Sequence, residues 1–279
     1  MFYFWTPLHL ATFKGDAEGV DLLLRNGAKV NDKTKDGMTA LHLAAKIGNK
    51  QIIEILVGKA ANVNAINVDG STPLHAAAFF GHQEILNFLI ENGADCSIEN
   101  KCGYLAVHLA AMNNKKEAME YLLKKVPLKN TNNVKGLILQ LASEKGHSEI
   151  VNSILSPGLS KDIINSKDRF GLTSLHLAAY NGFKNIVESL LINGANVSCK
   201  SNNDITALQL AEQRNHIDIV TLLEKEGSIE GIKSKEQFDK HSHALDRELF
   251  KKNNEECKEE NSKASNQKTE TKVTKAEVI

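Results

Sequence analysis

The motif TPLHLA at residues 6–11 returns along the chain, and its first four copies are spaced by 33 residues. Later copies keep the leucine and alanine positions, although the fifth and seventh have glutamine in place of histidine. The further copies lie at residues 39–44, 72–77, 105–110, 137–142, 173–178 and 206–211. A fixed period of this length is typical of repeat proteins, in which each unit buries its apolar face only against its neighbours. The chain is therefore expected to fold as a stack of about seven short units.

The motif carries the signals of a helix start. A threonine such as Thr6 acts as an N-cap, and Pro7 follows at a position where the helix needs no amide donor. A second apolar block comes later in each copy, for example VDLLL at residues 20–24, and it ends before a glycine such as Gly27, which suits a helix end with positive φ. Asp-Gly pairs such as Asp36-Gly37 fit turns between units. Each unit is thus predicted to contain two helices and a turn.

The two blocks together, TPLHLA and V-x-x-LL-x-x-GA at this period, resemble the ankyrin repeat, a β-turn followed by two antiparallel helices. The resemblance covers about residues 1–227. It implies an all-α solenoid of stacked helix-turn-helix units with projecting β-turns. The expected repeats lie near residues 1–33, 34–66, 67–99, 100–131, 132–167, 168–200 and 201–227.

Two repeats depart from the pattern. Repeat five lacks the threonine and histidine, is one residue short, and runs into the insertion SPGLS at residues 156–160, so we expect a looser joint there. The last repeat has Asp204 and Asn215 where other repeats have glycine, and its helix carries the polar Gln213. These residues are typical of a C-terminal capping repeat that faces water.

Beyond Gly227 the composition changes. Residues 228–279 contain 11 basic and 11 acidic side chains and few apolar ones, so most of this segment is predicted to be disordered, in particular the charged tail at residues 253–279. Residues 228–252 are the exception, because Phe238, Leu245 and Leu249 share one helical face. We expect a short capping helix there.

Bulk composition excludes several classes of partner. The chain has 34 basic and 34 acidic residues, so it lacks the positive field that gathers nucleic acid. No run reaches the roughly 18 to 20 apolar residues of a membrane span. The four cysteines are too few for a disulfide scaffold and lack zinc-site spacing, which favours reduced thiols and a cytoplasmic monomer. They are Cys96, Cys102, Cys199 and Cys257.

The recurring histidines are interpreted as architectural. A histidine in every first helix is placed to bond the threonine hydroxyl or the backbone of a neighbouring turn, which explains its repetition better than catalysis or metal binding does. These histidines are His9, His42, His75, His108 and His176.

No other pattern indicates an enzyme, a cofactor or a metal. The nucleophile, zincin and nucleotide-binding motifs are missing from the sequence. His241, His243 and Cys257 would hold a metal only if the tail folded around it. Asn64 resembles the site that asparaginyl hydroxylases modify in ankyrin repeats, with a loop asparagine bonded to neighbouring backbone as the alternative interpretation.

The resemblance implies where a partner would bind, because turn tips and the ends of first helices line the concave face of an ankyrin array. Large apolar side chains stand at many of these positions, as in the cores of protein interfaces. The candidate partner-binding residues are Met38, Ile47, Phe79, Phe80, Tyr104, Met112, Phe170, Leu172 and Tyr180. The alternative is that rings such as Phe79 and Tyr180 pack inward on neighbouring helices.

These observations predict a non-enzymatic scaffold or adaptor that binds a protein partner on the concave surface. A second hypothesis is a fragment of a secreted ankyrin-rich effector or latrotoxin-like toxin, because those proteins contain long arrays of this type. Enzymatic activity is the weakest hypothesis, since the sequence supplies no reaction centre.

Overall fold

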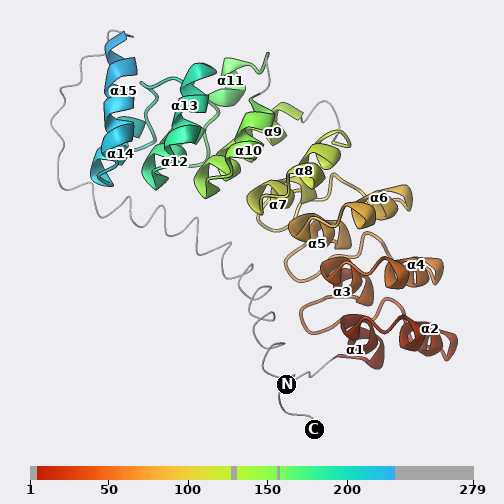
Figure 1. Cartoon of the computed structure of the whole chain (residues 1–279). Helices are drawn as coiled ribbons and strands as arrows, with labels where there is room; N and C mark the ends of the chain where they lie inside the picture. Colours follow the sequence, from red (N-terminus) through yellow and green to blue (C-terminus); the bar gives the residue numbers. More distant parts are fainter. Residues whose placement is uncertain (1–4, 127–130, 156–157, 230–279) are drawn as a thin grey trace. The chain divides into compact units, whose positions relative to one another are not determined.

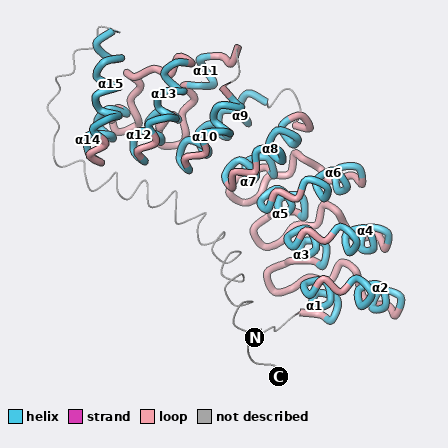
Figure 2. Tube along the Cα trace, viewed as in Figure 1, coloured by secondary structure: helices cyan, strands magenta, loops and turns pink. Residues whose placement is uncertain are grey.

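The structure, a computed structural model, describes residues 5–126, 131–155 and 158–229 (Figure 1). Within these ranges the chain contains helices, turns and loops but no strand (Figure 2). The helices are α1 Pro7–Lys14, α2 Ala17–Arg25, α3 Ala40–Ile47, α4 Lys50–Gly58, α5 Pro73–Phe80, α6 Gln83–Glu91, α7 Ala106–Met112, α8 Lys116–Leu123, α9 Thr131–Lys145, α10 Ser148–Ile154, α11 Lys161–Ile164, α12 Ser174–Asn181, α13 Lys184–Ile192, α14 Ala207–Gln213 and α15 Ile217–Ile229. The all-α prediction is confirmed.

Residues 230–279 lie outside the described part of the chain. The predicted capping helix therefore lies outside it beyond Ile229, as do the charged tail and the residues His241, His243 and Cys257.

The first helices begin at the threonines that the motif indicates. The Thr6 hydroxyl lies 2.8 Å from His9 Nδ1, and the backbone N–H of Thr6 donates to the same nitrogen at 3.2 Å. The same capping box joins Thr39 to His42. Because Nδ1 accepts this N–H, the ring proton is on Nε2. Each of these histidines is thereby fixed in one tautomer at the start of its own helix.

The other ring nitrogen joins neighbouring repeats. Nε2 donates to a backbone carbonyl in the turn before the next first helix, 3.1 Å from Asp32 O for His9 and 3.0 Å from Ser71 O for His42. His75 and His176 make the equivalent bonds. The architectural interpretation is confirmed for His9, His42, His75 and His176, since each of these rings bonds both its own helix start and the next turn.

Two rows of helices form the stack. The first helices α1, α3, α5, α7, α9, α12 and α14 pack in that order, and the second helices pack from α2 to α8 and from α10 to α15. Alanines such as Ala44 and Ala45 are fully buried and let the first helices approach closely. Between the two groups of second helices, α8 and α10 pack less closely and are linked by a 2.7 Å hydrogen bond from Ser153 Oγ to Glu120 Oε1.

Repeat five differs from its prediction. Its first helix, α9, has 15 residues and begins at Thr131, so it occupies the place where the other repeats have a turn. Gln140 replaces the histidine in function as well as in position, because its Nε2 donates to Ser166 O at 2.9 Å. His108, in the preceding repeat, loses its acceptor. Its Nε2 is buried without a hydrogen-bond partner in the described part of the chain.

The last repeat adopts the expected backbone without glycine. Asp204 and Asn215 have φ of 59° and 60°, in the left-handed region that Gly171 and Gly182 occupy in the repeat before. Asp and Asn tolerate this conformation better than other residues with a side chain. The polar substitutions in this repeat therefore preserve its shape.

A second contact between repeats was missed by the sequence analysis. His216, at the start of α15, donates from Nε2 to Tyr180 O at 3.1 Å, and its ring lies over Gly182. A Cβ atom at Gly182 would lie 2.6 Å from that ring. His82 is placed in the same way over Gly48. The glycine after each of these first helices therefore supplies a positive φ and also space for the ring of the next repeat.

Gly182→Ala is expected to destabilise the fold more than Gly93→Ala does, by about 1 kcal/mol, because only the first displaces a hydrogen-bonded ring. The two glycines have similar φ, 80° and 88°, so both variants carry the strain of a left-handed backbone, but no atom lies within 4 Å of a Cβ at Gly93. Urea unfolding of both variants measures the difference. Equal losses would show that the ring of His216 does not depend on this space.

Candidate protein-binding face

The turns between repeats form a row beside the first helices. In Figures 1 and 2 the loops before α3 and α5 lie on the side of the first helices that faces away from α2, α4 and α6. Backbone hydrogen bonds join successive turn tips, from Val68 N to Asp36 O at 3.0 Å and from Lys101 N to Asp69 O at 2.9 Å. We call this surface, made of turn tips and the C-terminal ends of first helices, the inner face.

Six of the candidate residues lie on the inner face between repeats two and four. Met38 and Tyr104 stand in turns, and the others at the ends of first helices. The rings of Phe79 and Phe80 are 4.9 Å apart, and the side chain of Ile47 is 36% exposed. The six are Met38, Ile47, Phe79, Phe80, Tyr104 and Met112. All except Ile47 are half-buried, so they pack on their neighbours and still leave surface to solvent.

Two more candidates lie in repeats six and seven, each under a guanidinium. Arg169 stands over the Phe170 ring with its Cζ 4.8 Å from the ring centroid, and Arg214 stands over the Tyr180 ring at the same distance. Both rings are half-buried and both arginines are exposed. Cation–π contacts of this kind orient the guanidinium and shield one face of the ring.

Leu172 does not belong to this surface. Its side chain is only 6% exposed, and its backbone N–H donates to Asp168 Oδ1 at 2.8 Å. The equivalent turn is closed by the same kind of bond, from Met38 N to Thr34 Oγ1 at 3.1 Å, yet Met38 stays half-buried, so the turn alone does not explain the burial of Leu172. The prediction that Leu172 contacts a partner is therefore corrected.

The row of turn tips has two segments. It runs through repeats two to four and resumes in repeats six and seven, where Asn202 N donates to Phe170 O at 2.9 Å. Repeat five contributes no turn, because α9 occupies that position. The periodic sequence predicts one uninterrupted strip, and the helical extension of α9 divides it.

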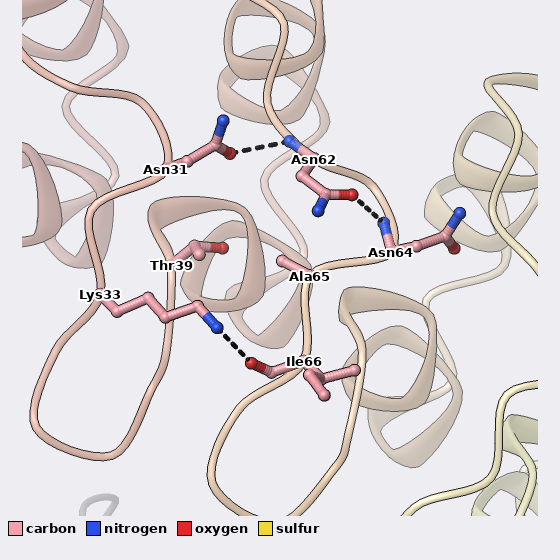
Figure 3. A pocket seen from close by; sticks show the side chains of 7 residues that line it. All are labelled: Asn31, Lys33, Thr39, Asn62, Asn64, Ala65 and Ile66. Atoms are coloured by element: carbon pink, nitrogen blue, oxygen red, sulfur yellow. Dashed lines mark hydrogen bonds between the residues drawn. The ribbon is translucent and has the colours of Figure 1, made fainter.

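One small pocket of about 260 Å³ lies between two loops, and Figure 3 shows its lining. Polar groups of its lining form hydrogen bonds within the protein. Asn31 Oδ1 accepts from Asn62 N at 2.8 Å, and Lys33 Nζ donates to Ile66 O at 2.8 Å (Figure 3). The lining residues are Asn31, Lys33, Thr39, Asn62, Asn64, Ala65 and Ile66.

Both the nitrogen and the oxygen of the Asn64 side-chain amide form hydrogen bonds to the next repeat. Its Nδ2 donates to Gly93 O at 3.0 Å, and its Oδ1 accepts from Asp95 N at 2.9 Å. Asn165 bridges to Gly194 and Asn196 in the same way. These bonds support the interpretation of Asn64 as a loop asparagine that links neighbouring repeats, and its hydroxylation stays a prediction.

Cysteine and acidic groups show no metal-binding arrangement in the described ranges. Cys96, Cys102 and Cys199 form no disulfide within the described part of the chain, and burial raises the pKa of Cys96. None of the helices in the same ranges combines the length and the apolar character needed to cross a bilayer.

Stacked helix pairs joined by a row of turns define a repeat solenoid, a class of protein whose function resides in its surface. The family model described as ankyrin repeats, three copies, matches residues 8–100, 92–165 and 139–233. The chain therefore belongs to the ankyrin repeat family. Ankyrin repeats are generally protein–protein interaction modules, and their fold is typically non-enzymatic.

Several known proteins are similar to part of this chain. The crystal structure of the human ASB11 ankyrin repeat domain superposes with a TM-score of 0.65 and 26% identity over 77% of this chain and 98% of that one. The tyrosine-protein kinase HTK16 of Hydra vulgaris is 34% identical over 34% of this chain. The ankyrin repeat and KH domain-containing protein mask-1 of Caenorhabditis elegans is 31% identical over 31% of it. These matches span only 12% and 3% of the two relatives.

Proposed function

We propose that this chain is a non-enzymatic scaffold or adaptor that binds a protein partner on its inner face, the concave surface of the expected solenoid. The observation that supports the proposal is the set of large apolar side chains at positions that the repeat itself does not prescribe. Phe79, Phe80 and Met112 stand where other repeats have Lys46, Lys145 or Arg214. Partly exposed aromatic and methionine side chains of this kind are typical of interface cores.

The rest of the structure agrees with a binding role. The polar groups of the repeats, including His42 and Asn64, hold the turns in place, so the inner face is prepared before a partner arrives. A preorganised surface loses less conformational entropy on association. The effector hypothesis stays a prediction that no observation on this structure favours.

Phe79→Ala is expected to weaken partner binding by about 2 kcal/mol or more if this ring is an anchor of the interface. The full chain, tagged and expressed in cells, is used to isolate bound proteins, and the affinity of each reproducible partner is then measured with purified components. Ile192→Ala is the matched control, because it removes an 85% exposed apolar side chain from the second helix α13.

Thermal melts of both variants separate binding from folding, since Phe79 is half-buried and its loss lowers stability to some extent. Partners that bind the folded Phe79→Ala chain as tightly as wild type, but are lost with Ile192→Ala, would place the interface on the second helices and contradict the proposal.

A further inference from the structure

The two rows of helices differ in the charges at their ends. The first turns of α1, α3, α5, α7, α12 and α14 contain no acidic residue, whereas those of α2, α6, α8 and α10 each contain a glutamate. The last turns of α1, α3 and α9 instead carry Lys14, Lys46 and Lys145. The glutamates at the starts of second helices and the lysines at the ends of first helices both suit the helix dipole. These lysines stand at helix ends that belong to the inner face.

The inner face is basic in a chain that is neutral overall. At the two turn-tip positions and the two helix-end positions of each repeat, seven residues are basic and three are acidic, against 34 of each in the whole chain. The basic ones are Lys14, Lys35, Lys46, Lys101, Lys145, Arg169 and Arg214. The acidic ones are Asp36, Asp69 and Glu144, of which Glu144 is paired with Lys145 at 2.9 Å.

Basic and apolar side chains alternate along this face. Lys35, Val68 and Lys101 occupy the same turn position in three successive repeats, and the backbone bonds between turn tips hold them in a row. All three are exposed, Val68 to 46%. Val68 is thus flanked on both sides by an exposed lysine of the neighbouring turn.

The arginines of repeats six and seven offer a similar combination. Arg214 stands over Tyr180 with its Cζ 4.8 Å from the ring centroid. A guanidinium that stacks on a ring by its face keeps N–H donors along its edge, and this edge matches the two oxygens of a carboxylate. The second segment of the inner face therefore also pairs an aromatic surface with positive charge.

We propose that the partner of the inner face is an extended acidic peptide segment in which carboxylates alternate with aromatic or aliphatic side chains. This inference rests on the proposed function and specifies its partner. Charge complementarity favours this class, because carboxylates on either side of an apolar residue match Lys35 and Lys101 on either side of Val68. Nucleic acid fits less well, since Asp36 and Asp69 interrupt the row of basic turn tips and the chain has no net positive charge.

The experiment is a selection of random peptides displayed on phage against the full chain. We expect enrichment of acidic peptides that contain aromatic or aliphatic residues, and their affinity should fall as salt rises. Fluorescence anisotropy with the synthesised peptides then compares variants. Lys35→Glu with Lys101→Glu should weaken binding by about tenfold or more, because it reverses two charges on the inner face.

The matched control reverses two charges elsewhere. Lys59 and Lys124 are exposed at the ends of the second helices α4 and α8, so Lys59→Glu with Lys124→Glu gives the same net charge and should leave the affinity nearly unchanged. Equal losses in both double variants would mean that only net charge matters and would overturn the proposal.

The remaining outcomes distinguish a failure of the acidic-partner proposal from a failure of the proposed binding function. Neutral or basic peptides whose binding is weakened by Phe79→Ala would overturn the acidic partner and leave the proposed function standing. A selection without enriched peptides, or peptides insensitive to every inner-face variant, would overturn both. Tighter binding of oligothymidine than of any selected peptide, lost in the Lys35→Glu, Lys101→Glu chain, would assign the face to nucleic acid instead.

Discussion

Acidification from pH 7 to pH 4 is expected to remove about 3 kcal/mol of folding stability for each of His42, His108 and His176. Burial of these rings lowers their pKa from the ordinary 6.5 to about 4. These histidines are therefore protonated near pH 6.5 in the unfolded chain, but only near pH 4 in the folded chain. The contribution of the neutral rings is complete above pH 6.5 and is lost as the pH falls toward 4.

His42→Gln tests this expectation with a residue that the chain already uses in this position. Gln209 Oε1 accepts from Thr206 N at 2.9 Å, and Gln140 Nε2 donates to the next turn, so glutamine keeps the bonds without a proton to gain. We expect a loss of about 1 kcal/mol at pH 7 but a smaller drop on acidification. Urea unfolding at both pH values measures it. A variant with the pH dependence of wild type would contradict the role of His42.

Leu41→Ala is expected to lower the free energy of unfolding by about 2 to 5 kcal/mol, because it removes burial and leaves a cavity between repeats. The side chain of Leu41 is fully buried, and Leu175 at the same motif position is 1% exposed. Chemical denaturation of the two alanine variants measures the loss.

Leu208→Ala is the matched control, since it makes the same change at the same motif position in the last repeat. Leu208 is only half-buried, because no helix pair follows α14 and α15 within the described residues. Its loss should therefore cost less than that of Leu41. A change below about 0.5 kcal/mol for Leu41→Ala would show that the leucine is not in the core and that the phase of the repeats is wrong.

The sequence by itself determined the repeat and most of its local geometry. The threonine N-cap, the histidine three residues later and the glycine at the helix end act within one repeat or between adjacent ones, so a periodic pattern is sufficient to predict them. Asp204 and Asn215 were identified for the same reason, because they stand at fixed positions where the backbone needs a positive φ.

Only the tertiary structure decided how one repeat meets the next where the pattern changes. The one-residue deletion in repeat five permits either a turn or a longer helix, and the packing of α9 against α7 and α12 selects the helix, which deprives His108 of its acceptor. The ring of His216 over Gly182 likewise joins two residues about one repeat apart. Periodicity identifies equivalent positions, but contacts between non-identical neighbours determine which side chains remain on the surface.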